Sequence, residues 1–316
     1  MKVFVTSRVP EDILTLLKED FEIIYHDSEI PLKKEEIMDM VKDSDAILCP
    51  LSDKIDIDIL NSGKNLKMIA NYGAGFDNID IVSAREKNIV VTNAPAPSSA
   101  VSTAELTFGI MLCLARNLVN GDKEVRNNNF NGWRPTYFLG NELRGKTLGI
   151  IGMGNIGKNF AKRALAFDMN VIYNSRNRKE DIENLGAKFV EKDYLIENAD
   201  FISLHSAFAP ELKHMISDKE FEDMKDSAFL INAARGSLVD EKALIQALRE
   251  NKIAGAGLDV YEFEPEVSKE LFELENVVLE PHLGNATFEA RLEMGNAAVE
   301  NLIEFKNGVI PRNKVN

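Results

Sequence analysis

Short apolar runs alternate with helical patterns along most of the chain, and this alternation limits the possible folds more than any other feature. In residues 1–93 the runs are KVFV, FEIIY, DAILC, LKMIA and IVV, and the stretches between them carry apolar residues at three-to-four spacing. A second series, from residue 147 on, contains TLGIIG, NVIYNS, DFISLH, AFLINA, IAGAGLDV and VVLEP. Such alternation predicts parallel sheets covered by helices on both faces. We therefore predict an α/β protein with two doubly wound parallel-sheet domains.

A break in the alternation indicates how the domains divide. NAPAPSSAVS (93–102) holds two prolines and three serines, and it predicts a hinge. The segment 287–306 has helical spacing with no strand after it, so it could return to the first domain. With 316 residues and 45% hydrophobic content, the chain can build two cores. We expect one domain in residues 1–98 plus 287–316 and a second in residues 99–286, with a cleft between them.

Charge and cysteine content exclude several classes of protein. The net charge is −14 at pH 7, and no basic segment is clustered enough to follow nucleic acid. Cys49 and Cys113 lie in apolar surroundings without metal-ligand spacing, so both are expected to be buried thiols in a reducing compartment. The N-terminus has no cleavage site, and no segment reaches the roughly 18 apolar residues of a membrane span. We expect a cytoplasmic protein with no metal, nucleic acid or membrane as partner.

A long helix is expected from about residue 102 to residue 120. TAELTFGIMLCLARNL is apolar around most of its surface, and a helix so poorly solvated needs cover from another domain or subunit. We predict a homodimer through the helix near 102–120; the alternative is a helix buried within one subunit.

Three glycines at G-x-G-x-x-G spacing predict a nucleotide site. The motif follows the strand candidate TLGIIG and opens the helical pattern NIGKNFAKRALAF. The first glycine allows a tight turn, the second lets the backbone approach a pyrophosphate, and the third brings helix and strand together. The helix N-terminus then faces the phosphates with free N–H groups. We expect a Rossmann domain that binds a dinucleotide at Gly152, Gly154, Asn155, Ile156 and Gly157.

The next strand candidate ends without the usual acidic residue. A carboxylate there would bind the ribose 2′-hydroxyl of NAD but repel the 2′-phosphate of NADP, and this chain has Asn174, Ser175 and Arg176 instead. Arg176, together with Arg178, could bind phosphate oxygens through charge-assisted hydrogen bonds. We predict a preference for NADP(H). The alternative is a solvated basic turn and the cofactor NAD(H).

Polar residues follow three strand candidates of the second series. Arg235 comes after FLINA, Asp259, Glu262 and Glu264 follow IAGAGL, and His282 follows VVLEP. Open α/β sheets place ligands at this carboxyl edge. Reduction of a 2-keto acid by hydride needs a cation for the carboxylate, a proton donor for the carbonyl oxygen and a carboxylate that keeps the donor protonated. One Arg, one Glu and one His meet that requirement.

Five motifs in order, NYGAGFDNID, GIIGMGNIG, INAARGSLVDE, GLDVYEFEP and PHLGNAT, resemble those of the D-isomer-specific 2-hydroxyacid dehydrogenases across nearly the whole chain. The resemblance implies that Arg235 binds the substrate, that His282 is the general acid, and that Glu264 hydrogen-bonds His282 and raises its pKa. Asp259 would lie on the nicotinamide side, and Ala233 belongs to the expected cofactor set. Glu262 is the rival of Glu264, which is preferred because it directly precedes a proline. The other three histidines share none of the setting of His282.

The same resemblance assigns the remaining parts. The first domain would be a flavodoxin-like substrate domain, the final helix would belong to it, and the long helix would form the dimer. In NYGAGFD, the backbone at Ala74 and Gly75 would bind the substrate carboxylate; the alternative is a simple strand-to-helix turn. Asn285 stands where the family often has a small Ser, so the sequence does not predict what residue 285 contacts.

The expected substrate is a small, unphosphorylated 2-keto acid. Leu51 stands where phosphoglycerate dehydrogenases carry Arg, and both YNSRNRK and the segment 131–150 look like glyoxylate and hydroxypyruvate reductases. An aromatic of that segment, Trp133 or Phe138, could approach the pocket but could equally serve packing. The alternatives are a reductase of bulkier 2-keto acids using NAD(H), and a nucleotide-sensing regulatory binder, because fold alone does not fix function.

Overall fold

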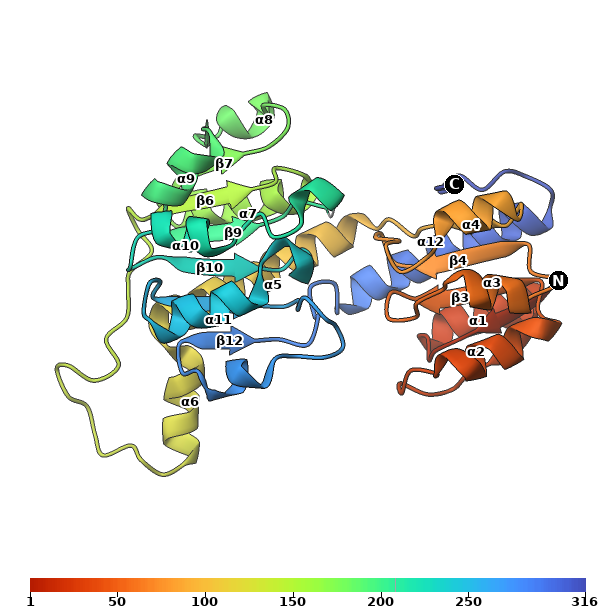
Figure 1. Ribbon diagram of the computed structural model, residues 1–316, viewed down its shortest axis with the longest axis horizontal. Helices are drawn as coiled ribbons and strands as arrows, with labels where there is room; N and C mark the ends of the chain where they lie inside the picture. Colours follow the sequence, from red (N-terminus) through yellow and green to blue (C-terminus); the bar gives the residue numbers. More distant parts are fainter. Residues whose placement is uncertain (208) are drawn as a thin grey trace. The chain divides into compact units, whose positions relative to one another are not determined.

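The computed structural model describes residues 1–207 and 209–316, and the chain forms two compact units. Unit 1 comprises Met1–Ser99 and Asn285–Asn316, and unit 2 comprises Ala100–Gly284. Each unit is built on a parallel sheet with helices packed on it (Figure 1). The predicted α/β class with two parallel-sheet domains is confirmed.

Unit 1 contains a five-stranded parallel sheet in the order β2-β1-β3-β4-β5. This is the flavodoxin-like order, in which the chain starts inside the sheet and moves outward in both directions. Strands form where apolar residues cluster, so each predicted run overlaps its strand, although β3, β4 and β5 extend one or two residues beyond the end of their runs. The strands are β1 (Lys2–Val5), β2 (Glu22–Tyr25), β3 (Ala46–Pro50), β4 (Met68–Tyr72) and β5 (Val90–Thr92). The helices are α1 (Glu11–Asp20), α2 (Lys34–Met40), η1 (Val41–Asp43), α3 (Ile57–Ser62), α4 (Ile81–Glu86) and α12 (Phe288–Lys306).

The last helix, α12, completes the core of unit 1 although it lies far from the other elements in sequence. Its first turn is capped by Thr287, whose side-chain oxygen accepts a hydrogen bond from the N–H of Ala290 at 3.2 Å. Its fully buried side chains pack against α1 and β4: Met294, Ala298 and Leu302. The final residues then bind the edge strand β5, where the N–H of Val315 donates to the carbonyl of Val91 at 2.9 Å.

Unit 2 contains a seven-stranded parallel sheet in the order β12-β11-β10-β9-β6-β7-β8. This order reverses between β6 and β9, which creates the topological switch point of a Rossmann fold. The strands are β6 (Thr147–Ile151), β7 (Asn170–Asn174), β8 (Lys188–Phe189), β9 (Phe201–Leu204), β10 (Phe229–Asn232), β11 (Gly255–Leu258) and β12 (Val277–Leu279). The helices are α6 (Leu118–Arg126), α7 (Asn155–Ala166), α8 (Glu180–Glu183), α9 (Lys192–Asn198), η2 (Pro210–Leu212), α10 (Asp218–Asp223), η3 (Gly236–Leu238), α11 (Glu241–Arg249) and η4 (Lys269–Glu273).

The bounds expected for the long helix are wrong at both ends. Helix α5 (Pro97–Arg116) begins inside the segment expected to be a hinge, because a proline is well tolerated at the first helical position. It ends early because Asn117 adopts the left-handed conformation with φ 52°, and α6 begins at the next residue.

The expectation that no segment is apolar enough to span a membrane is also wrong for α5. By length and composition α5 could cross a membrane, but half of its apolar window is buried inside the protein. Its buried side chains include Phe108, Met111 and Leu114, which belong to the same core as Phe160 of α7. The core helix of a soluble protein can have the same length and composition, so these two properties alone do not indicate a membrane protein.

Candidate active site

The glycine turn between β6 and α7 has the conformation that the motif predicts. Gly152 has φ 100°, where a side chain is disfavoured, and a Cβ there would lie 2.5 Å from the backbone nitrogen of Ser206. A Cβ on Gly157 would lie 2.3 Å from the carbonyl oxygen of Gly152. Helix α7 begins at Asn155 after Gly154, and no side chain caps it. The first-turn N–H groups, including that of Ile156, therefore have no partner within the helix and suit a pyrophosphate.

The turn after β7 contains polar residues and cations in place of a carboxylate. The side-chain amide of Asn174 donates to the carbonyl of Val190 at 2.9 Å, and the hydroxyl of Ser175 donates to the carbonyl of Asn177 at 2.7 Å. Arg176 is exposed, and among the described residues it has no hydrogen-bond or ion-pair partner. Arg176 can therefore reach a ligand without breaking an existing contact.

Arg178, in contrast to Arg176, already has partners in the structure. Its guanidinium binds both carboxylate oxygens of Glu183, at 2.7 and 3.2 Å, and lies 5.7 Å from the ring centre of Phe189. Hydrogen bonds from Arg178 and Tyr173 lower the pKa of Glu183 to about 2. The expected help of Arg178 in phosphate binding is therefore not supported, because a phosphate would have to displace Glu183.

The three expected catalytic residues follow neighbouring strands of the unit 2 sheet. β10, β11 and β12 are adjacent, so their carboxyl ends bring Arg235, Glu264 and His282 to one edge. Nδ1 of His282 lies 2.9 Å from Oε2 of Glu264, and both side chains are partly exposed. Among the described residues, Nε2 of His282 has no partner, so it can face a ligand.

Glu264 is held as an ionised acceptor. Its second oxygen accepts a hydrogen bond from the N–H of Tyr261 at 2.9 Å. Although burial raises the pKa of Glu264, the hydrogen bond and charge of His282, the N–H of Tyr261 and the charge of Arg235 together hold it below its usual value. An ionised Glu264 fixes the orientation of the His282 ring and stabilises its protonated form.

Arg235 leaves β10 through a short buried segment. Ala233 and Ala234 are both buried, and the guanidinium of Arg235 donates to the carbonyl of Ala234 at 2.7 Å. The carbonyl of Arg235 accepts a hydrogen bond from the side chain of Asn232 at 2.9 Å. The direction in which the chain leaves the strand is therefore fixed by β10 itself.

Asp259 organises the loop that carries His282. Its two carboxylate oxygens accept the N–H groups of Leu283 at 2.6 Å and Gly284 at 2.8 Å. Burial raises the pKa of Asp259 despite these hydrogen bonds. The contacts tie the end of β11 to the loop after β12, a role that the sequence alone did not indicate.

The expectation that no other histidine shares the setting of His282 is wrong for His214. Nε2 of His214 lies 2.6 Å from Oε1 of Glu262, so the unit holds a second His–Glu pair. His205 is different, because its ring is buried against Phe160 and its Nε2 lies 2.9 Å from the hydroxyl of Ser203. Burial lowers the pKa of His205 to about 3, so it stays neutral at physiological pH.

In unit 1, the loop after β4 offers backbone N–H groups. The carbonyls of Gly73, Ala74 and Gly75 each accept a hydrogen bond from elsewhere in the unit, from the N–H of Ala94 and from the side chains of Asn93 and Asn71. Among the described residues, nothing accepts from the N–H of Ala74 or Gly75. These groups can bind an anion, as expected for the substrate carboxylate.

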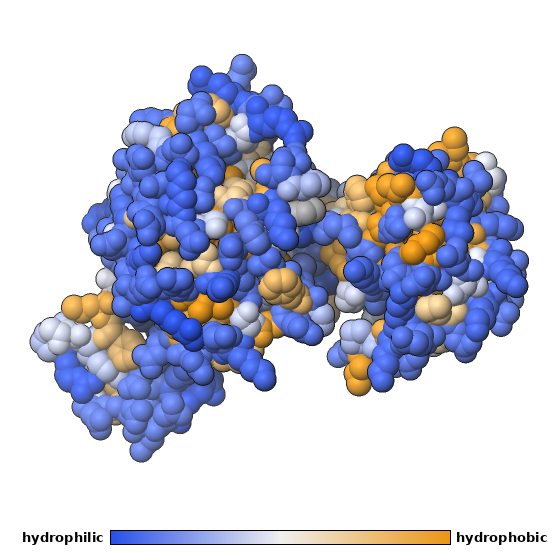
Figure 2. Space-filling view, in the orientation of Figure 1, coloured by the Kyte–Doolittle hydropathy of each residue, from blue (hydrophilic) through white to orange (hydrophobic). Residues whose placement is uncertain are grey.

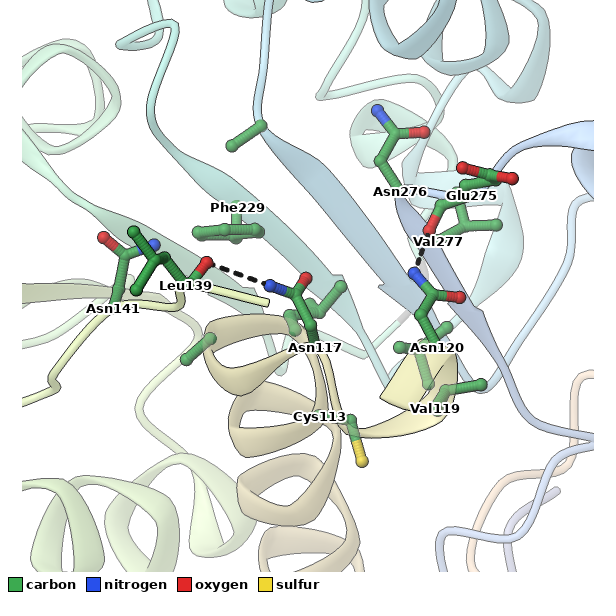
Figure 3. Close-up of a pocket in the computed structure, with 14 residues that line it drawn as sticks. Cys113, Asn117, Val119, Asn120, Leu139, Asn141, Phe229, Glu275, Asn276 and Val277 are labelled. Carbon is green, nitrogen blue, oxygen red and sulfur yellow. Dashed lines mark hydrogen bonds between the residues drawn. The ribbon is translucent and has the colours of Figure 1, made fainter. Parts of the chain in front are cut away.

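A pocket of about 240 Å³ lies in unit 2 away from these residues (Figure 3). It opens at the amino ends of the strands, beside Phe229 at the start of β10 and Val277 at the start of β12, whereas the glycine turn and His282 follow the carboxyl ends. Asn117 and Asn120 reach its wall and donate to backbone carbonyls. Cys113 also lines it and is only partly buried, so the expectation of two buried thiols is correct for Cys49 alone.

A Rossmann unit whose sheet edge holds Arg, Glu and a histidine with one free ring nitrogen defines a nicotinamide-dependent oxidoreductase. The family model "D-isomer specific 2-hydroxyacid dehydrogenase, NAD binding domain" matches residues 108–284. The chain is 49% identical, over its full length and 99% of the relative, to a Staphylococcus haemolyticus protein whose name places it among the 2-hydroxyacid dehydrogenases. The chain therefore belongs to the D-isomer-specific 2-hydroxyacid dehydrogenase family and is an enzyme of that class.

Solved structures match the whole chain as well. A Thermus thermophilus protein superposes with a TM-score of 0.93 at 38% identity, with both chains covered completely. D-lactate dehydrogenase from Aquifex aeolicus, complexed with NAD and lactic acid, gives 0.87 at 30% identity, covering 100% of this chain and 99% of that one. A glyoxylate reductase from Paecilomyes thermophila gives 0.84 at 32% identity, covering 100% and 98%.

Proposed function

We propose that this dehydrogenase is an NADP(H)-preferring reductase of small 2-keto acids, with glyoxylate and hydroxypyruvate as leading substrates and D-2-hydroxy acids as products. The observation that carries the reaction is the His282–Glu264 pair, with its free ring nitrogen, at the same sheet edge as Arg235. A bound nicotinamide would supply the hydride for the carbonyl carbon. The glycine turn, with its uncapped helix N-terminus, fits the pyrophosphate of that cofactor.

Three side chains of the protein bind the substrate, donate the proton and stabilise the proton donor. Arg235 binds the substrate carboxylate and polarises the keto oxygen, as a guanidinium suits a planar acid. As the hydride arrives, Nε2–H of His282 gives its proton to the developing alkoxide, so the product is neutral at that oxygen. Glu264 stabilises the positive charge that His282 carries before this transfer. His282 then regains its proton from solvent. His282→Ala is expected to lose orders of magnitude in kcat while binding cofactor normally, and near-normal turnover would contradict this mechanism.

The cofactor preference rests on the turn after β7. Arg176 has no partner to give up among the residues that the structure describes, and neither Asn174 nor Ser175 would repel a 2′-phosphate. Charge-assisted hydrogen bonds to the phosphate would each contribute roughly 1.5–3 kcal/mol. Arg176→Ala should therefore weaken NADPH binding by about tenfold or more and leave NADH unchanged. Arg178→Ala is the matched control, and an equal loss in both variants would contradict the assignment.

The preference for a small, unphosphorylated acid rests on Leu51. Its side chain packs against the Gly73 turn, where a Cβ would lie 2.8 Å from it, so an apolar group rather than a cation borders the anion-binding loop. The similarity to a glyoxylate reductase agrees with this reading, whereas the similarity to a D-lactate dehydrogenase bound to NAD supports NAD(H) as the cofactor.

One assay separates these possibilities. NADPH and NADH are each mixed with glyoxylate, hydroxypyruvate, pyruvate and a branched 2-keto acid, and the absorbance of the reduced nicotinamide is followed. Faster oxidation of NADPH with the two small acids supports the proposal. Preference for NADH with the bulkier acids supports the alternative. Cofactor binding without turnover for any pair would support a nucleotide-sensing binder.

A homodimer through the helix near 102–120 is part of this proposal, and we extend the proposed interface into α6 and the segment after it. α6 buries none of its side chains and, with the segment that follows it, projects from unit 2 (Figure 1). This projection exposes large apolar side chains, some of them visible on the surface in Figure 2, and Trp133 is 83% exposed. The exposed members are Leu118, Val125, Phe130, Trp133, Phe138 and Leu139. A second copy would cover them, so Leu118→Lys should shift the sedimenting species from dimer to monomer; a monomeric wild type would contradict the proposal.

A further inference from the structure

The second histidine–carboxylate pair joins the segments that carry the proposed catalytic residues. Nε2 of His214 lies 2.6 Å from Oε1 of Glu262, and Nδ1 lies 3.6 Å from Oδ2 of Asp240. The three residues follow β9, β11 and β10, respectively. Arg235 and Glu264 follow two of the same strands. The His214 ring therefore connects the segments that follow three neighbouring strands.

The backbone of His214 is strained, and its hydrogen bonds do not involve the ring. His214 has φ 53°, a left-handed conformation that costs a residue with a side chain roughly 1 kcal/mol relative to glycine. Its N–H already donates to the carbonyl of Ser237 at 2.9 Å, and the N–H of Ile216 donates to Leu238 at 3.1 Å. The backbone alone thus attaches this segment to the one after β10. What the ring adds is the link to Glu262.

Glu262 is fixed from two sides. Its side chain is only 8% exposed, and while Oε1 faces His214, Oε2 accepts the N–H of Glu241 at 3.2 Å. In return, Oε2 of Glu241 accepts the N–H of Glu262 at 3.1 Å, and its other oxygen accepts from the hydroxyl of Ser268. The partner of the remaining oxygen, Oε1 of Glu262, is the His214 ring. Removing the ring would leave an oxygen of Glu262 without this partner.

Movement of Glu262 would reach both proposed catalytic side chains. Glu264 lies two residues further on, and the N–H of Tyr261 orients its carboxylate toward His282. On the other side, the backbone of Tyr261 packs against Gly236, where a Cβ would lie 1.9 Å from the carbonyl carbon of Tyr261. Because the two backbone segments are this close, a shift of residues 261–262 would displace Gly236, the residue after Arg235.

We propose that His214 is a positioning residue of the reduction: its hydrogen bond to Glu262 holds the segment with Glu264 in register with the segment that carries Arg235. This inference rests on the proposed function, since it gives His214 an effect only through those two residues. Catalytic side chains must be held within about 0.5 Å of their productive positions, so loss of the His214–Glu262 hydrogen bond would slow the reaction.

The test compares variants with the same backbone requirement. His214→Gly keeps the left-handed backbone but removes the ring, and we expect kcat to fall about tenfold or more, with unchanged cofactor Kd, a smaller change in KM and an unchanged urea unfolding midpoint. His214→Gln keeps one donor for Glu262 and should recover most of the lost kcat. Asn251→Gly is the control, because exposed Asn251 has φ 53° in the same unit and no side-chain hydrogen bond among the described residues.

The pairing itself is tested by Glu262→Gln. Because His214 and Glu262 act together, the double variant His214→Gly/Glu262→Gln should be no slower than the slower single variant. Wild-type kcat in His214→Gly, or a loss of unfolding free energy without a loss of kcat, would overturn the proposal. Should His214→Gly fail to fold, Glu262→Gln weakens the same link from the other side, and wild-type kcat in that variant would overturn the proposal. Full activity in Glu264→Gln and His282→Ala would instead overturn the proposed function.

Discussion

His205 predicts a specific acid sensitivity of the fold. Its ring is buried against Phe160, with ring centres 5.3 Å apart, and burial lowers its pKa from 6.5 to about 3. In the unfolded chain the same ring takes up a proton below pH 6.5, whereas in the folded chain it stays neutral down to about pH 3. Acid therefore favours unfolding throughout this window, and above pH 6.5 the group has no effect.

The size of the effect follows from the unfolded value. One proton of difference changes the free energy of unfolding by about 1.4 kcal/mol per pH unit, so at pH 5.0 His205 removes about 2 kcal/mol. The result does not depend on the exact folded pKa as long as it lies well below 5. For a protein with about 5–15 kcal/mol of stability, that is a large share.

Urea unfolding of the wild type and of His205→Gln, followed by circular dichroism at pH 7.5 and 5.0, measures this contribution. Each protein is compared with itself, so the cost of the substitution and the titration of shared carboxylates cancel. The wild type should lose about 2 kcal/mol more than the variant between the two pH values. Equal losses would refute the reasoning, because they would mean that the folded chain protonates His205 as readily as the unfolded chain does.

Three further predictions concern the site. Gly152→Ala should lose roughly 1–3 kcal/mol of unfolding free energy because of its φ of 100°, whereas Gly154→Ala, which meets no atom within 4 Å, should keep its stability and lose NADPH affinity in a fluorescence titration. Asp259→Asn should lower kcat about tenfold or more, because one backbone N–H of the His282 loop would then face an amide instead of an oxygen; unchanged kcat would count against that role. Since the pKa of Glu264 lies below its usual value, its pair with His282 is complete above the ordinary carboxyl range and is lost as the pH falls through the lowered value. An acid limb should therefore appear in the pH profile of kcat/KM and be absent from that of Glu264→Gln.

The sequence predicted most strands because their signal is local. The run KVFV is short and apolar, contains two β-branched valines and is followed by polar residues, so its sequence alone predicts β1. β8 was missed because two residues, Lys188 and Phe189, carry no detectable period. The start of α5 was missed because a Pro-Ser-rich stretch resembles a loop, although Pro97 is acceptable where a helix begins.

The site was predicted residue by residue, but its supporting contacts were not. Arg235, Glu264 and His282 each follow a strand, and parallel strands bring their carboxyl ends together, so their meeting could be expected from order alone. His214 meets Glu262 across 48 positions, and Arg178 meets Glu183 across a turn of unpredictable shape. Such pairs depend on the path of the loops, which the apolar pattern does not encode.

The interrupted chain of unit 1 has a consequence for how the protein is made. On a ribosome, the sheet of unit 1 emerges first, yet α12 and the residues that bind β5 emerge only after all of unit 2. During that interval the apolar faces of α1 and β4 lack their cover, and uncovered faces of this kind are prone to aggregation. Unit 2 is contiguous and can complete its core earlier, so the domain that starts synthesis is the last to finish folding.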